Sequence, residues 1–194
     1  NFLSENPDTP VAEMDSVIGR IGGKVLLTVY FRPSAMLFAF LRDRNTSQSV
    51  LDCFDRLWSE EGAGRGLFRR IFPVILTDNG SEFSNPSAIE SAQGVHRARV
   101  FYCDACASWQ KGGIERDHEL LRLILPRGTP FDDLAQDDIN LALSHVNSYS
   151  RPSREDKSPY DLFAFRYGTD LLDKLGIRKI APNDIILKPS LLAR

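Results

Sequence analysis

The segment VLLTVYFRPSAMLFAFL, residues 25–41, contains two long apolar runs separated by Arg32-Pro33-Ser34. Apolar runs of this length that end at turn residues are typical of buried β-strands. A third run, VAEMDSVIG at 11–19, precedes them. We therefore expect three consecutive strands, joined as an antiparallel meander.

Helical and strand patterns then alternate. Residues 45–62 (NTSQSVLDCFDRLWSEEG) carry apolar residues at helical spacing behind a polar capping cluster and end at a glycine. We expect a glycine-rich loop over 62–66, a short strand ending at Asp78, and another strand over 98–104. Helical patterns return over 112–125 and 132–149.

The fold class that this order predicts is α/β: a mixed sheet of about five strands with helices on both faces. We expect one large domain over residues 1–150. Residues 151–194 begin with the Pro- and charge-rich RPSREDKSP and are expected to form a linker and short helices.

Composition narrows the class of protein. With 42% hydrophobic and 26% charged residues, the chain is typical of soluble globular proteins. No apolar run approaches the roughly 18 residues that suggest a membrane span. The three cysteines do not form a disulfide framework, which favours the cytoplasm. The first residue is Asn1 and no leader pattern follows, so we expect a piece of a longer protein.

Asp78 lies where a short buried strand, VILT at 74–77, ends. Asp-Asn-Gly is turn chemistry, so a small hairpin is one interpretation. The other is a functional site, because strands in helix-covered sheets present ligand-binding groups at their carboxyl ends. The local sequence favours neither.

Two further acids are candidates. Asp15 lies in the middle of the first strand, although strands disfavour aspartate, and alternation places it on one face with Glu13. The alternative is that this face is solvated. Glu115 borders the apolar face of its helix, after Gly112-Gly113. Its alternative is an exposed ion pair with Arg122 or Lys111.

Together, Asp15, Asp78 and Glu115 form a possible constellation, from a first strand, a later strand end and a following helix. Three carboxylates that lie close together repel one another and need a cation or a proton. Oxygen ligands select Mg²⁺ or Mn²⁺, and a pair of such ions is the usual device for in-line attack on a phosphodiester.

Four strings in order carry a resemblance to a known family: EMDSVIG at 13–19, LTDNGSEF at 76–83, SWQKGGIERDHELLR at 108–122 and SHVNSYSRPSREDKSPYDLF at 144–163. They resemble the integrase core of DDE transposases, most closely the bacterial insertion-sequence type numbered thirty. The resemblance implies an RNase H-like fold in which Asp15, Asp78 and Glu115 hold two Mg²⁺ or Mn²⁺ ions.

The resemblance also implies the partners. They are DNA, as element ends and as target, and further copies of the chain in a homo-oligomer at the nucleoid. An N-terminal helix-turn-helix region would belong to the whole transposase. Lys111, Arg116 and Arg122 flank Glu115 and are expected to contact DNA phosphates. His118 stands where close relatives often carry Asn, and we interpret it as packing or contacting DNA.

Other functions stay open. The net charge of −2 suits a nucleic-acid binder poorly, since such proteins are usually basic. A cellular nuclease of the same fold and a non-catalytic DNA-binding or assembly module are the alternatives, and the three intact acids argue against the second. Cys103 and Cys106 form a single C-x-x-C, which is half of what a structural zinc site needs.

Overall fold

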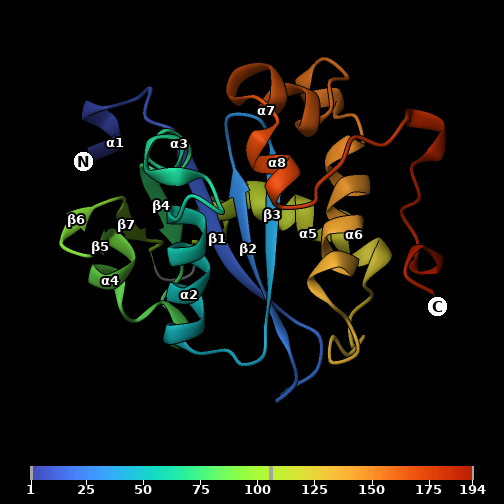
Figure 1. Cartoon of the computed structure of the whole chain (residues 1–194), viewed down its shortest axis with the longest axis horizontal. Helices are drawn as coiled ribbons and strands as arrows, with labels where there is room; N and C mark the ends of the chain where they lie inside the picture. The colour runs from blue at the N-terminus through green and yellow to red at the C-terminus, as the bar shows by residue number, and fades with distance from the viewer. Residues whose placement is uncertain (1, 105–106, 194) are drawn as a thin grey trace.

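The computed structural model describes residues 2–104 and 107–193. Its centre is a mixed five-stranded sheet with the order β3-β2-β1-β4-β7 (Figure 1). The first three strands form the expected antiparallel meander, and β4 and β7 continue the sheet parallel to β1. The strands are β1 Val11–Ile18, β2 Val25–Phe31, β3 Met36–Arg42, β4 Val74–Thr77 and β7 Arg99–Tyr102.

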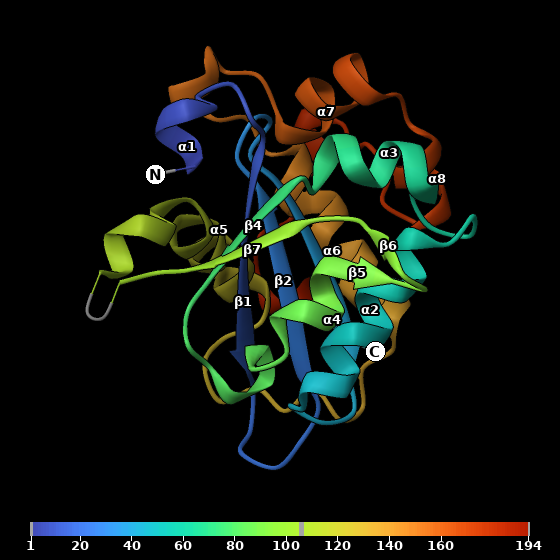
Figure 2. The ribbon, with the colours of Figure 1, turned by 90° about the vertical axis from the view of Figure 1, so that its left-hand side faces the viewer.

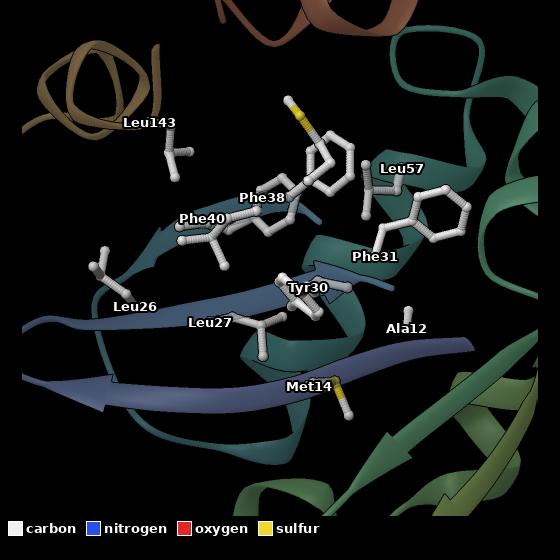
Figure 3. Close-up of a cluster of buried hydrophobic side chains, with 14 of the residues drawn as sticks. Ala12, Met14, Leu26, Leu27, Tyr30, Phe31, Phe38, Phe40, Leu57 and Leu143 are labelled. Atoms are coloured by element: carbon white, nitrogen blue, oxygen red, sulfur yellow. The ribbon is translucent and has the colours of Figure 1, made fainter. Parts of the chain in front are cut away.

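Helices cover both faces of the sheet, as expected (Figure 2). On one face α5, Gly112–Ile124, lies so close to β2 that a Cβ atom at Gly113 would overlap the ring of Tyr30. On the other, the ring of Phe163 in α7 lies 6.1 Å from that of Phe31 and 5.6 Å from that of Phe38. Every residue of β2 is buried as a result, and Figure 3 shows part of the apolar cluster that this packing creates.

The edge strand β3 is covered by α6, Gln136–Ser148. The side-chain amide of Asn147 accepts a hydrogen bond from the Leu37 N–H at 2.9 Å and donates one to the Leu37 carbonyl at 2.8 Å. The side-chain amide of Gln136 does the same near one end of the strand: it accepts a hydrogen bond from the Leu41 N–H and donates one to the Ala39 carbonyl. These amides satisfy backbone groups that an edge strand would otherwise leave open.

One helix lies where the sequence predicted a loop. Helix α3, Gly64–Ile71, begins inside the glycine-rich stretch, and its apolar face buries Phe68 and Ile71. Gly64 has φ +68°, a conformation that glycine adopts without strain and that allows the sharp turn into the helix. Burial of the apolar face outweighs the low helix propensity of the glycines.

The C-terminal residues form short helices, as expected, and Phe163, Leu171 and Leu172 belong to the same buried cluster as the sheet. The boundary at residue 150 stays a prediction. No helix in the described part of the chain is both long and apolar enough to cross a membrane. The other helices are α1 Phe2–Glu5, α2 Ser47–Trp58, α4 Pro86–Glu90, α7 Pro159–Tyr167 and α8 Asp170–Lys174, and β5 Ser91–Ala92 with β6 Val95–His96 forms a small hairpin.

Candidate active site

Asp15 and Asp78 are brought together by the parallel pairing of β1 and β4. The register pairs Glu13 of β1 with Leu76 of β4. Two residues further along each segment lie Asp15, in β1, and Asp78, directly after β4. Because side chains two residues apart share a face of a strand, both carboxylates emerge on the same side. The two aspartates are far apart in the sequence, so the pairing of β1 with β4 is what brings them together.

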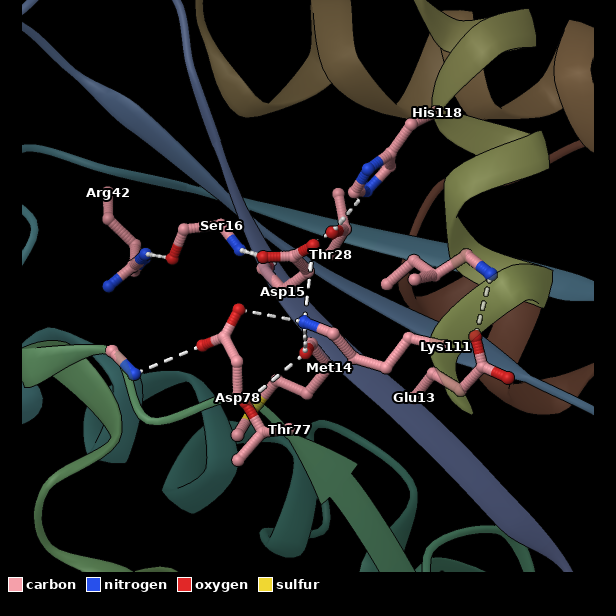
Figure 4. Close-up of polar contacts among 12 residues, drawn as sticks. Glu13, Met14, Asp15, Ser16, Thr28, Arg42, Thr77, Asp78, Lys111 and His118 are labelled. Carbon is pink, nitrogen blue, oxygen red and sulfur yellow. Dashed lines mark hydrogen bonds and ion pairs between the residues drawn. The ribbon is translucent and has the colours of Figure 1, made fainter. Parts of the chain in front are cut away.

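The two carboxylates converge on the ammonium group of Lys111, as Figure 4 shows. Lys111 Nζ lies 2.9 Å from Asp78 Oδ2 and 3.4 Å from Asp15 Oδ2. The Lys111 side chain is only 6% exposed, whereas the Asp78 side chain is 49% exposed. The aspartate pair therefore binds a cation at its inner side and is open to solvent on its outer side.

The pKa values reflect this arrangement. Burial raises the pKa of the Asp15 carboxyl, and the Lys111 ammonium partly opposes that effect. Burial alone would lower the pKa of Lys111, but the two aspartates outweigh it and raise that pKa. The lysine is therefore held in its charged form.

Asp78 also starts a turn. Its Oδ1 accepts a hydrogen bond from the Gly80 N–H at 3.1 Å, while Oδ2 faces Lys111. The chain then enters a short 3₁₀ helix, Ser81–Phe83, and not the second strand of a hairpin. The hairpin interpretation is therefore wrong, although Asp78 does start a turn, and its two carboxylate oxygens have separate partners.

Glu13 is a buried acid that anchors α5. It is 2% exposed, its Oε1 lies 2.6 Å from Arg32 Nε, and its Oε2 accepts a hydrogen bond from the Ile114 N–H at 2.7 Å. This face of β1 is therefore not solvated, contrary to one expectation from the sequence. The Ile114 bond holds the first turn of the helix, next to Glu115.

Glu115 is exposed and lines a hollow of about 790 Å³, whose lining includes Ser16, the neighbour of Asp15 in the chain, but neither aspartate. Within the described ranges, no group of three His, Cys, Asp or Glu side chains lies close enough to hold a metal ion. The structure thus brings Asp15 and Asp78 together, but it does not gather Glu115 with them into the expected three-carboxylate group. The lining residues are Ser16, Val17, Ile18, Glu115, His118, Glu119, Arg122 and Arg127.

His118 connects α5 to the strands. Its Nε2 lies 2.8 Å from Thr28 Oγ1, and the Thr28 hydroxyl donates to the Asp15 carbonyl at 3.0 Å. The hydroxyl has one proton to give, so His118 donates from Nε2. Burial, with the charges of Arg122 and Lys111, lowers the pKa of His118 to about 4, which leaves the ring neutral at pH 7.

The three basic residues that were expected to contact DNA phosphates lie in three different environments. Arg122 lines the hollow with Glu115 and donates to the Ile18 carbonyl at 3.0 Å. Arg116 lines a separate cavity of about 600 Å³ with Trp109, on another side of α5. Lys111 points inward, toward the aspartates. Arg127, which no sequence pattern singles out, lines the same hollow as Arg122.

Cys103 is a buried free thiol whose pKa is raised by burial. Its partner in the C-x-x-C motif, Cys106, lies outside the described residues, so the role of the pair stays open.

The sheet order, the helices on both faces and the acids on adjacent strands define an RNase H-like α/β fold. The catalytic core domain of BIV integrase has this fold and matches with a TM-score of 0.56, 18% identity, and coverage of 82% of this chain and 96% of the integrase domain. No family model matches the chain.

Two transposases are similar in sequence. The transposase for insertion sequence element IS1086 of Cupriavidus metallidurans is 31% identical over 91 residues, which cover 47% of this chain and 26% of the relative. Transposase InsI for IS30A of Escherichia coli is 25% identical over 88 residues, covering 45% and 22%. The chain thus spans about a quarter of each relative, and its resemblance to transposases of the type numbered thirty is confirmed.

Proposed function

We propose that this chain is the catalytic core of a transposase or integrase that cuts and joins DNA by metal-dependent phosphodiester hydrolysis and strand transfer. The observation that carries the proposal is the convergence of Asp15 and Asp78, from adjacent parallel strands, on one cation. The similarity to insertion-sequence transposases supports the substrate class, DNA.

The donor set suits hard divalent ions. Asp15 and Asp78 present carboxylate oxygens to a positive charge already, and carboxylates are what Mg²⁺ and Mn²⁺ prefer. We propose that Asp15, Asp78 and Glu115 hold two such ions. When bound, such ions would supply charge stabilisation for the attacking and leaving oxygens of a phosphodiester.

The protein's own residues would orient the reactants. Neutral His118, bonded through Thr28 to the Asp15 backbone, fixes the helix of Glu115 against the strand of Asp15. Arg122 and Arg127 lie in the hollow together with Glu115 and Glu119, and their guanidinium groups suit DNA phosphates. The cavity lined by Arg116 is not part of this surface.

The test is a cleavage and strand-transfer assay on duplexes that carry the ends of the element, with the full-length protein and Mg²⁺ or Mn²⁺. We expect Asp15→Asn, Asp78→Asn and Glu115→Gln each to lower the rate at least about 100-fold, since each removes part of several kcal/mol of charge stabilisation. Glu119→Gln is the matched control, because it removes an acid from the same hollow and helix. It should retain most of the activity.

The DNA products of the assay distinguish the alternative functions. Joined products identify a transposase or integrase, hydrolysis alone identifies a nuclease of this fold, and unchanged cleavage in Asp78→Asn would mean that the chemistry occurs elsewhere. Assembly into a homo-oligomer and association with the nucleoid stay predictions.

A further inference from the structure

Lys111 is the last residue of a short 3₁₀ helix, Ser108–Lys111, directly before α5. Its ammonium group has three acceptors: Asp78 Oδ2 at 2.9 Å, Asp15 Oδ2 at 3.4 Å and the Met14 carbonyl at 3.4 Å. A lysine has three N–H donors, so each has a partner. Such a complete set is unusual for an exposed DNA-contacting lysine and indicates an internal role.

The charges explain that role. Asp15 and Asp78 carry two negative charges on adjacent strands, and without a cation they would repel each other. Lys111 supplies one positive charge between them. It therefore stabilises the geometry of the pair, but leaves the three groups together with one net negative charge.

A divalent ion needs the same oxygens. Mg²⁺ takes carboxylate ligands at about 2.0–2.1 Å, and an ammonium beside the same oxygens would repel it. The ion can approach from solvent, because the Asp78 side chain is half exposed. Lys111 and the ion thus compete for Asp15 Oδ2 and Asp78 Oδ2.

We propose that Lys111 is a displaceable internal cation: it holds Asp15 and Asp78 together before metal binds, and metal binding drives its ammonium group out of the site. This inference rests on the proposed function, since it requires that the aspartates bind metal. A Cβ atom on the residue that follows, Gly112, would meet no atom within 4 Å, so the backbone beside Lys111 is not crowded. The lysine side chain is flexible, so its ammonium group can change position.

The first test measures Mn²⁺ affinity by calorimetry for the parent chain and for Lys111→Met, which has similar length and no charge. Competition predicts that the variant is less heat-stable in EDTA yet binds Mn²⁺ about tenfold more tightly, within the usual range of coupling between two sites. Lys24→Met is the control, because Lys24 bonds, among the residues that the structure describes, only to the Leu134 carbonyl. It should leave the affinity unchanged.

The possible results distinguish failure of the Lys111 displacement from failure of the proposed metal site. Equal or weaker binding by Lys111→Met, with normal binding by the parent chain, overturns the displacement and leaves the metal site standing. Absence of Mn²⁺ binding in both chains overturns the metal site of the proposed function and this inference with it.

The second test needs no variant. Reductive methylation of the parent chain, read by mass spectrometry, should modify Lys111 slowly in EDTA because its side chain is 6% exposed. Saturating Mn²⁺ should raise that rate several-fold, with Lys24 as the internal standard. A rate that stays the same, in a chain that calorimetry shows to bind Mn²⁺, overturns the proposal.

Discussion

His118 links the helix of Glu115 to the strand of Asp15 through a single hydroxyl, that of Thr28. The ring is neutral because burial and nearby positive charges lower its pKa to about 4. An unfolded chain would protonate the same ring at about pH 6.5. The difference makes the stability of the folded chain depend on pH.

The sign of the dependence follows from proton binding. Between pH 6.5 and 4 the unfolded chain binds a proton at His118 and the folded chain does not, so the stability present above pH 6.5 falls as the pH is lowered. The loss from this residue reaches about 3 kcal/mol at pH 4. Urea unfolding at several pH values should show a shallower fall for His118→Asn, which keeps a hydrogen-bond donor but does not titrate. Parallel curves for the two chains would contradict this role.

The residues around Asp15 and Asp78 differ in how far the sequence alone could indicate their positions. Asp15 was identifiable as a candidate because strands disfavour aspartate, and Asp78 because it follows a buried strand, although turn chemistry explains Asp78 equally well. The inward position of Lys111 was not, because it depends on residues 33 and 97 positions away that only the folded sheet brings near. A lysine beside a candidate acid gives the same local signal whether it faces DNA or the acid.

At the scale of elements, α6 protects the open edge of the sheet. Asn147 bonds both backbone groups of Leu37, and it is completely buried. Asn147→Ala would leave a buried N–H and a buried carbonyl without partners, at about 1–3 kcal/mol each. We expect urea unfolding to show a loss of about 2–5 kcal/mol. Gln48→Ala removes an exposed amide from a helix and should change little; an equal loss there would contradict the edge-protection argument.

A buried ion pair fixes the other side of α5. Asp117 and Arg151 lie 3.0 Å apart with side chains 5% and 11% exposed, and burial raises the pKa of Asp117 to about 6 despite the arginine. Arg151→Met would leave the carboxyl buried alone and should destabilise the chain by about 3–5 kcal/mol. Lys157→Met, in an exposed pair of the same segment, is the control and should have little effect. Comparable losses in the two variants would mean that the pair is not what anchors the helix.

The elements themselves were largely predictable. Apolar runs gave the meander and helical spacing gave α2, α5 and α6, because burial on one face imposes a period on the sequence. Helix α3 was missed because its glycines argue against a helix locally, while the packing of Phe68 and Ile71 against the rest of the chain decides the outcome. The pairing of β1 with β4 could come only from the family resemblance, since no local pattern specifies parallel partners.

For the whole molecule, charge and length set the expected DNA binding. The chain has a net charge of −2, and its matches cover 26% of the IS1086 transposase and 22% of the IS30A transposase. Phosphate neutralisation supplies most nonspecific affinity for DNA, and the hollow beside the acids offers only Arg122 and Arg127 for it. This chain by itself should therefore bind duplex weakly and with little sequence preference.

Fluorescence anisotropy at several salt concentrations measures the affinity of the chain for duplex DNA. With about two phosphates neutralised, the logarithm of affinity should fall with the logarithm of salt with a slope of about −2, and Arg122→Gln should reduce the slope by about one. Arg178→Gln is the control, since Arg178 pairs with Asp173 on α8, away from the hollow. The full-length protein should bind the ends of its element far more tightly and selectively, because the resemblance implies a helix-turn-helix region there. If the 194-residue chain binds the element ends as tightly and as selectively as the full-length protein, recognition of the ends lies in this domain. If the salt dependence of affinity is steep and Arg122→Gln does not change it, the phosphate contacts lie on another surface.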